Sequence, residues 1–234
     1  TAREVLEPMG KKLIGIRLDS GDLAYLSKEA RKMLDEAGLS DCMIVASNSL
    51  DEYTISSLNR QGAKIDSYGV GERLITSSST PVFGAVYKLV AIQKDGKFIP
   101  KIKISETAEK ITNPGIKEVY RVYDENGKAV ADYLAVKGEQ IRDFDPVRYV
   151  DPVNYWKNRS FVGCRFKKLQ VPVFEKGKRI YDLPDIEEIR QYVKDQLENE
   201  IWEEEQRFEN AHTHYLDMSP AMFELKMSLL HEEN

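Results

Sequence analysis

The sequence of 234 residues predicts an α/β protein: part of an incomplete β/α barrel with parallel strands, followed by an antiparallel β-rich layer and C-terminal helices. Two observations carry this prediction. Over residues 1–84, short apolar runs alternate with amphipathic helical segments, which indicates parallel strands joined by right-handed crossovers. From residue 85 onward the hydrophobic period shortens to two, and Asp-Gly and Asn-Gly turns appear, which is typical of antiparallel hairpins. We therefore expect two domains, 1–84 and 85–234.

The first domain repeats a pattern of strand, turn and helix. Its strands are predicted at 13–18, 43–46 and 65–68, with amphipathic helices over 22–37 and 51–60. Parallel pairing brings the loops after all three strands to one edge, which in a β/α barrel holds the active site. An eight-stranded barrel needs about 200 residues or more, so three units cannot close one. We expect the chain to be a piece of a barrel whose earlier strands are missing.

The second domain is expected to begin with antiparallel strands. Two hairpins share one design, in which an Asp-Gly or Asn-Gly turn separates β-rich runs: 86–93 with 98–105, and 119–123 with 129–135. A further strand is predicted at 166–174, with a turn at 176–178. Together these segments predict a layer distinct from the parallel sheet.

The C-terminal part of the chain is expected to be helical. Pro184 suits the first turn of a long acidic helix whose apolar residues at 186, 189, 193, 197 and 201 share one face. Ser219 and Pro220 are typical of an N-cap followed by the first helical residue, and they predict a last helix that ends at Leu230.

The composition indicates a cytoplasmic protein that binds neither nucleic acid nor membranes. The formal net charge is −5, which argues against the basic face of a nucleic-acid binder. No apolar run reaches the roughly 18 residues of a membrane span. The two cysteines, Cys42 and Cys164, lack zinc-ligand spacing and fit a reducing compartment. His212 and His214 have no ligand nearby in the sequence to complete a metal site, so we interpret them as surface residues.

The sequence GIRLDSGDL over 15–23 is the most specific local feature. Arg17 and Asp19 alternate with apolar residues at a strand end, so both side chains are expected on the same side. Asp19 would then accept hydrogen bonds from sugar hydroxyls, and Arg17 would bind or stack on an aromatic carboxylate. The alternative is a buried structural ion pair, with Ser20 capping the next helix. The spacing alone weighs the two interpretations about equally.

A second feature is the glycine loop, Gly69-Val70-Gly71-Glu72-Arg73. Glycines let backbone N–H groups approach a phosphate closely, especially at a helix start, although a plain tight turn has the same pattern. Lys88, Lys101 and Lys103, in the first predicted hairpin, offer cations for a diphosphate. A solvated strand face is the better interpretation of any one of these lysines.

These residues, in this order, resemble the nicotinate phosphoribosyltransferase family. The resemblance is carried by segments that span nearly the whole chain, namely 15–39, 44–55 (IVASNSLDEYTI), 65–76 (IDSYGVGERLIT), 86–106 and 112–124. It implies a type II phosphoribosyltransferase fold, with an incomplete β/α barrel and an α/β sandwich to which 85–234 contributes. It also implies that nicotinate and phosphoribosyl diphosphate give nicotinate mononucleotide and diphosphate on the salvage route to NAD, with Mg²⁺ and hydrolysis of ATP.

The resemblance also assigns residues to the substrates. Arg17 would contact the pyridine ring or diphosphate, and Asp19 the ribose hydroxyls. The complete set of substrate-binding residues that it implies is Arg17, Asp19, Ser20, Ser47, Asn48, Gly71, Glu72, Lys88 and Lys103. Within it, Ser47 and Asn48 would line the ribose pocket, and Gly71 and Glu72 would present amides to the 5′-phosphate. Lys88 and Lys103 are weaker candidates for phosphate contacts.

One family element lies outside this sequence. The family's phosphorylated histidine precedes the Arg-x-Asp strand, and no histidine precedes Arg17 here. We therefore expect no catalytic residue in this chain, an inactive fragment on its own, and a homodimer with a composite active site for the longer protein. The alternatives are an enzyme of the nicotinamide phosphoribosyltransferase type, a non-catalytic phosphosugar-binding module, and a structural domain.

Overall fold

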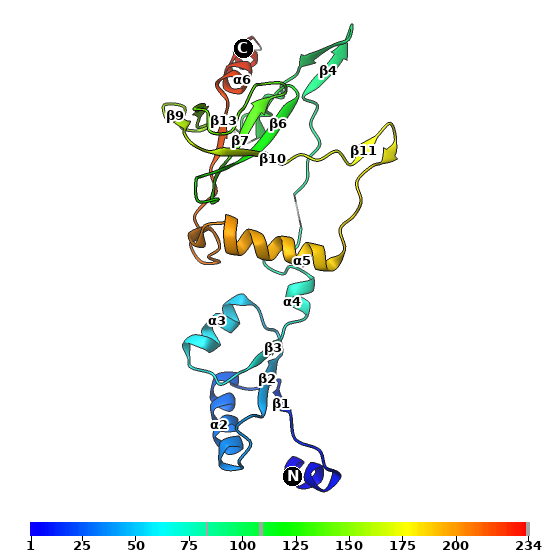
Figure 1. The fold of residues 1–234 in the computed structure, drawn as a ribbon, viewed down its shortest axis with the longest axis vertical. Helices are drawn as coiled ribbons and strands as arrows, with labels where there is room; N and C mark the ends of the chain where they lie inside the picture. Colours follow the sequence, from blue (N-terminus) through cyan, green and yellow to red (C-terminus); the bar gives the residue numbers. More distant parts are fainter. Residues whose placement is uncertain (83, 108–109, 233–234) are drawn as a thin grey trace. The chain divides into compact units, whose positions relative to one another are not determined.

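The structure, a computed structural model, describes residues 1–82, 84–107 and 110–232. The chain forms two compact units, Thr1–Ala85 and Val86–Asn234 (Figure 1). The first unit contains a parallel sheet with helices, and the second contains a largely antiparallel six-stranded sheet, two small hairpins and helices. Among the described residues, no helix has both the length and the apolar character required to cross a membrane.

The first unit is built on a parallel sheet in the order β1-β2-β3. Its elements are α1 (Ala2–Leu6), a 3-10 turn (Glu7–Met9), β1 (Gly15–Leu18), α2 (Leu23–Glu36), β2 (Met43–Ser47), α3 (Glu52–Arg60), β3 (Ser67–Gly69) and α4 (Glu72–Ile75). The order of strands and helices is the one that the sequence predicts. Helices α2 and α3 follow β1 and β2 and pack their apolar sides against the sheet through Ala24, Leu34 and Leu58.

Helix α2 begins and ends where its sequence directs. The Asp22 side chain accepts a hydrogen bond from the Tyr25 N–H at 3.0 Å and is the N-cap. At the other end Gly38 has φ +71°, a left-handed conformation that glycine adopts at little cost after a helix. The prediction that Ser20 caps this helix is wrong, because Asp22 lies next to the first turn and provides the carboxylate.

The second unit contains a six-stranded sheet in the order β10-β6-β7-β13-β8-β9. Its strands are β6 (Lys117–Tyr123), β7 (Ala129–Val136), β8 (Val147–Val150), β9 (Asn158–Phe161), β10 (Arg165–Lys168) and β13 (Leu216–Met218). Strand β13 pairs parallel to β7 and antiparallel to β8. Its three residues therefore join the β6–β7 hairpin to strands β8 and β9 in one sheet.

Two predicted turns are confirmed. Strands β4 (Ala91–Lys94) and β5 (Lys97–Pro100) meet at Asp95-Gly96, and both turn residues have positive φ, as a tight two-residue hairpin requires. Strands β6 and β7 form the second hairpin, and a bulge lies between Val122 and Tyr123. A small third hairpin, β11 (Phe174–Glu175) with β12 (Lys178–Arg179), forms around the turn predicted at 176–178.

The core of the second unit occupies both faces of the six-stranded sheet. On one face Tyr133, Phe161 and Phe166 meet edge to face, and Tyr149 stacks on Phe161 with ring centroids 4.3 Å apart. On the other face, α6 (Pro220–Glu232) packs through Met222 on residues of β7 and β13. Aromatic burial of this kind stabilises the sheet by roughly 1.5–3 kcal/mol for each large side chain.

The C-terminal helices confirm one predicted start and correct another. The Ser219 hydroxyl accepts a hydrogen bond from the Met222 N–H at 3.0 Å, and Pro220 opens α6, as the sequence predicts. Helix α5 (Ile186–Asp195) instead begins after Asp185, whose carboxylate forms a capping box with Glu188. The position predicted for Pro184 is therefore wrong, because the better cap follows it by one residue.

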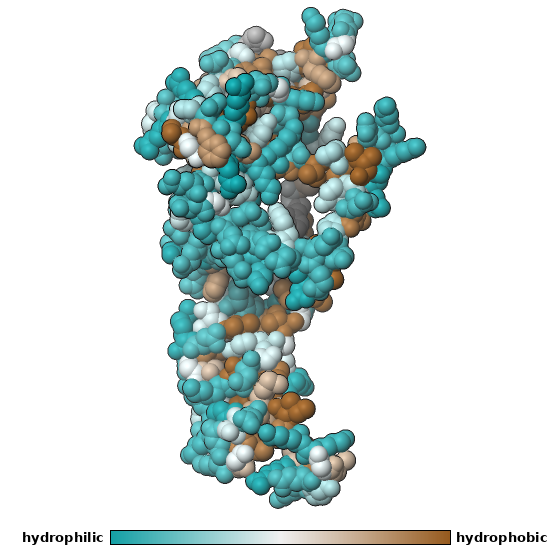
Figure 2. Space-filling model, in the orientation of Figure 1, coloured by the Kyte–Doolittle hydropathy of each residue, from teal (hydrophilic) through white to brown (hydrophobic). Residues whose placement is uncertain are grey.

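Helix α5 is also shorter than predicted. A π-helical turn (Gln196–Glu200) follows it, and Ile201 has extended backbone beyond that turn. The apolar residues Ile189, Val193 and Leu197 are partly exposed on this helix. The face of α5 in view is predominantly hydrophilic, in keeping with its amphipathic sequence (Figure 2).

One carboxylate is buried within the second sheet. Asp217, in the middle of β13, is 7% exposed. Burial, followed by the charge of Asp151, raises the pKa of Asp217 from 3.8 to about 6. Because the folded-state pKa exceeds the unfolded value, the folded protein binds this proton more tightly, and its stability falls as the pH rises from about 4 to about 6.

We predict that Asp217→Asn increases the free energy of unfolding above pH 6 by on the order of 2 kcal/mol, because a neutral amide replaces a poorly solvated charge. Near pH 4, where Asp217 is protonated, the gain is expected to be small. Denaturant unfolding of both proteins across this range measures the difference. Asp145→Asn, at an exposed position of the same unit, is the control. A constant difference at all pH values would contradict the assignment.

Candidate functional site

The carboxyl ends of β1, β2 and β3 lie at one edge of the parallel sheet. Arg17 on β1 lies beside Val45 on β2, and its guanidinium reaches both strand ends. One amino group donates to Ser47 Oγ at 2.8 Å, and the other donates to Asp19 Oδ2 at 2.8 Å. The three residues therefore form one hydrogen-bonded set, as expected for side chains that leave the same side of neighbouring strands.

This set is open to water. The side chains of Arg17 and Asp19 are 62% and 52% exposed. The alternative prediction of a buried structural pair is therefore wrong, because both side chains are more than half exposed. Two nitrogens of the Arg17 guanidinium each donate one hydrogen bond to a protein oxygen, and an arginine has five N–H donors. Donors remain for an anionic or carbonyl ligand at this edge.

The loop after β2 has an unusual backbone. Asn48 has φ +95° and Ser49 has φ +49°, so two consecutive residues other than glycine adopt left-handed conformations. Such conformations cost on the order of 1–3 kcal/mol each and gather at ligand-binding loops. Ser49 Oγ donates to the Asn48 side-chain oxygen at 3.3 Å. The side chains of Asn48 and Ser49 therefore leave a left-handed backbone that sequence patterns do not reveal.

The glycine loop ends in a short helix. Gly71 is the N-cap of α4, so the first N–H groups of this turn face the loop after β3. Glu72 accepts a hydrogen bond from the Thr76 hydroxyl through its backbone carbonyl at 2.7 Å. Ser20, Gly71 and Glu72 are exposed at the same edge as Arg17 and Asp19. The edge thus combines a cation, a carboxylate, hydroxyls and backbone amides.

Sequence reasoning missed an ion pair that joins two of these loops. Arg73, the last residue of the glycine loop, donates to Asp51, which is also the N-cap of α3. Hydrogen bonding from Thr54, with a smaller contribution from Arg73, lowers the pKa of Asp51 to about 2. The sequence signals were the cap position of Asp51 and the arginine that ends the glycine loop, and neither identifies its partner.

The two lysines predicted for phosphate contacts belong to the second unit. Lys88 precedes β4, and Lys103 follows β5. The expectation that they sit within the hairpin is wrong, because the carbonyl of Val90 accepts from both Lys101 and Gly115 and the regular ladder ends there. The Lys103 backbone instead pairs with Thr112.

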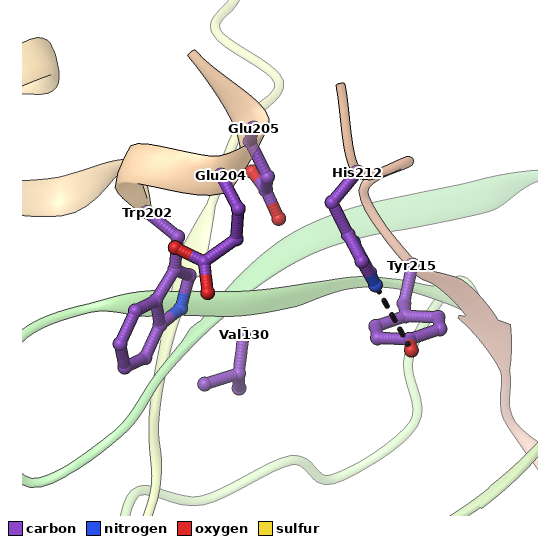
Figure 3. Close-up of a pocket in the computed structure, with 6 residues that line it drawn as sticks. All are labelled: Val130, Trp202, Glu204, Glu205, His212 and Tyr215. Carbon is purple, nitrogen blue, oxygen red and sulfur yellow. Dashed lines mark hydrogen bonds between the residues drawn. The ribbon is translucent and has the colours of Figure 1, made fainter. Parts of the chain in front are cut away.

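The second unit contains a hollow of about 280 Å³ lined by Val130, Trp202, Glu204, Glu205, His212 and Tyr215 (Figure 3). The Tyr215 hydroxyl lies 3.4 Å from His212 Nε2. Two residues after His212, the Nδ1 atom of His214 lies 3.1 Å from both carboxylate oxygens of Glu205. Its side chain is 26% exposed, so the prediction of a surface residue is wrong for His214. Among the described residues, no cluster of three or more potential ligands could hold a metal ion.

Comparison with known proteins gives a consistent result. The family model described as "Nicotinate phosphoribosyltransferase C-terminal domain" matches residues 116–226. The chain is 48% identical over 220 residues to the nicotinate phosphoribosyltransferase of Bacillus subtilis, covering 94% of this chain and 45% of that protein. It is 36% identical over 234 residues to the enzyme of the same name from Dictyostelium discoideum, covering 94% and 39%.

Solved structures agree on the fold. Human nicotinic acid phosphoribosyltransferase aligns with a TM-score of 0.72 at 24% identity, over 94% of this chain and 41% of that one. Nicotinate-nucleotide pyrophosphorylase from Pyrococcus furiosus aligns with a TM-score of 0.54 at 27% identity, over 85% and 43%. These likenesses confirm the type II phosphoribosyltransferase-like fold class. The chain spans less than half the length of each of these relatives.

We predict that Asp51 controls the order of the glycine loop. Asp51→Ala removes both the cap and the contact with Arg73, so hydrogen exchange is expected to become faster at the amides of Thr54 and of 72–75. Asp51→Asn retains a capping oxygen but loses the ion pair, so only the second group should exchange faster. The difference should fade as the pH falls toward 2, where the carboxylate becomes protonated. Unchanged exchange in α4 in both variants would contradict this link.

Proposed function

Because the chain belongs to the nicotinate phosphoribosyltransferase family, we propose that it supplies substrate-binding residues to an enzyme that makes nicotinate mononucleotide and diphosphate from nicotinate and phosphoribosyl diphosphate, with ATP hydrolysis, in NAD salvage. The observation that supports this proposal best is the hydrogen-bonded set of Arg17, Asp19 and Ser47 at the edge of the parallel sheet. A parallel α/β sheet binds its ligands at this edge.

The reaction displaces diphosphate from the anomeric carbon and builds positive charge on the ribose ring. Asp19, together with Ser47 and Asn48, holds the ribose hydroxyls and orients the ring for attack by the pyridine nitrogen. The Asp19 carboxylate also lies near the developing charge and stabilises it. Arg17, which is fixed by Asp19 and Ser47, directs its remaining donors to the nicotinate ring or the diphosphate.

The phosphates engage the neighbouring loops. Gly71 and Glu72 present backbone amides to the 5′-phosphate, and Ser20 adds a hydroxyl at the same edge. Lys88 and Lys103 are the weaker assignments, as cations for the diphosphate. Arg73 holds the glycine loop to Asp51 and therefore acts as a positioning residue.

We propose that a magnesium ion arrives on phosphoribosyl diphosphate, because Mg²⁺ commonly binds one or two carboxylates together with substrate phosphates, and Asp19 offers an exposed carboxylate at this edge. When bound, it neutralises the leaving diphosphate. We assign no ATP-dependent step to this chain, since its three histidines, at 212, 214 and 231, all follow the first unit. The phosphorylated histidine is proposed to come from sequence outside residues 1–234. We also propose that the longer protein is a cytoplasmic homodimer whose active site combines residues of both subunits.

A chimera tests the proposal. In it, this chain replaces the matching 45% of the Bacillus subtilis relative. We predict nicotinate-dependent release of diphosphate in the presence of phosphoribosyl diphosphate and ATP. Asp19→Asn is expected to lower kcat/KM by about a hundredfold or more, because positioning and charge stabilisation are lost together. Steady-state assays of diphosphate release measure both effects.

The matched control is Asp41→Asn, which removes an exposed carboxylate of the same unit that forms a surface ion pair with Lys12. Its activity should equal that of the parent chimera. A preference for nicotinamide would assign the chain to the sister activity. A folded chimera that binds nicotinate mononucleotide without turnover would favour the non-catalytic phosphosugar-binding module, and full activity of Asp19→Asn would remove the assigned role.

A further inference from the structure

A second hollow in the second unit, of about 430 Å³, is lined by none of the residues assigned to the substrates. It opens on the aromatic face of the six-stranded sheet, and its lining consists of Val130, Ala131, Tyr149, Asp151, Lys157, Arg159, Phe161, Tyr215 and Asp217. It shares Val130 and Tyr215 with the smaller hollow of Figure 3. Its volume lies within the range of roughly 300–1,000 Å³ that is typical of small-molecule sites.

The sheet register explains why these side chains gather. Asp217 on β13 pairs with Tyr133 on β7, and Met218 pairs with Leu134 and Val150. Paired residues share a face, and successive residues alternate between faces. Asp217 therefore lies on the Tyr133 face, opposite α6, and Tyr149 and Asp151 point to the same side from β8 and the residue after it.

Asp217 is a buried carboxylate in this hollow that no protein group in the described part of the chain stabilises. It is 93% buried, it lines the hollow, and its carboxylate forms no hydrogen bond or ion pair with any residue that the structure describes. Asp151 differs, because it accepts hydrogen bonds from the backbone of Val153 and Asn154 and from the Asn154 side chain. A buried carboxylate without a partner is costly, so a ligand that supplies a positive charge would relieve that cost.

The negative charges of this hollow lie deeper than its positive charges. The two carboxylates belong to buried or half-buried residues, whereas Lys157 and Arg159 are exposed at the rim. Between them, Tyr149 stacks on Phe161 and offers an aromatic wall. Aromatic faces attract an organic cation and also bury its hydrocarbon part. This arrangement suits a ligand whose positive end enters first.

We propose that this hollow binds a primary ammonium ion with a short hydrocarbon body, its charge at Asp217 and its body against Tyr149 and Phe161. The ammonium group donates hydrogen bonds to the carboxylate that otherwise has no partner. Two sources carry this chemistry: a free small amine, and a lysine side chain of another polypeptide segment. All of its lining residues belong to the second unit, and none of them is among the residues assigned to the substrates.

The test is a titration of the 234-residue chain, followed by the amide resonances of 215–218 and 149–151. The probes are hexylamine, the neutral hexanol as its control, and N-acetyl-lysine N-methylamide for the side-chain source. We expect both amines, and not hexanol, to shift these resonances. Asp217→Asn should weaken amine binding at least tenfold, because the charge partner is lost, whereas Arg159→Gln should leave binding equal or tighter.

The pH dependence supplies a second readout in the unaltered protein. Amine affinity should rise as the pH increases through about 6, because only the ionised Asp217 carboxylate binds the cation. The ionisable groups that face Asp217 from the neighbouring elements are Tyr133, Tyr149, Asp151, Lys157, Arg159 and Tyr215. Burial raises the pKa of Tyr133 and Tyr149, and hydrogen bonds from Asn154 and Val153 outweigh burial and lower the pKa of Asp151, so the shifts of these three groups move them away from pH 6.

Each outcome decides the proposal. Tighter binding of hexylamine identifies a free amine as the source, and tighter binding of the blocked lysine identifies a polypeptide segment; both support an ammonium site. Equal binding of hexanol and hexylamine, undiminished binding to Asp217→Asn, or absence of shifts at these amides would overturn it. Asp217→Asn is expected to fold, since it replaces a destabilising buried charge.

Discussion

The parallel register of β1, β2 and β3 is the constraint on which the first unit depends. Arg17 lies beside Val45, and Ser47 lies beside Gly69, so the residues that follow each strand begin at nearly the same height. A shift of one residue in either pair would turn the side chain of residue 17 or 47 to the opposite face. The contact from Arg17 to Ser47 and Asp19 therefore exists only because backbone hydrogen bonds fix the two strands first.

The second unit depends on a contact that joins distant parts of the chain. Strand β13 has only three residues, yet it lies between β7 and β8 and continues directly into α6. Ser219 both caps α6 and donates to Glu139, which lies eighty positions earlier. This position in the middle of the sheet buries Asp217. The same packing that holds the C-terminal helix therefore creates the carboxylate without a partner.

Local chemistry decided how much of this fold could be predicted. Turns at Asp95-Gly96 and at 124–128, the caps of α6, and the alternation of β1, α2 and β2 depend on neighbouring residues, and the sequence predicted them correctly. Strands β8, β9 and β13 were missed because they are short and are stabilised by partners far along the chain. Helix α5 was placed two residues early because two capping signals, Pro184 and Asp185, competed.

The candidate site was predictable to a similar degree. The pattern of Arg17 and Asp19 at a strand end predicted that both would leave the same side, and they do. The left-handed backbone at Asn48 and the pairing of Asp51 with Arg73 could not be predicted, because each depends on how separate loops meet. Burial was the least predictable property: the buried alternative for Asp19 is excluded by its exposure, and His214, predicted at the surface, is half-buried.

The exposure of Arg17 and Asp19 bears on what their pair is for. Exposed ion pairs contribute a median of about 0–1 kcal/mol to stability, so an arginine and an aspartate at 62% and 52% exposure do little to hold the sheet together. Arg121 and Asp132 differ, because they form two hydrogen bonds across β6 and β7 at about a fifth exposure. That second pair has the geometry of a structural ion pair. The first has free donors, open access and a strained loop beside it, which favours a ligand over a purely structural role.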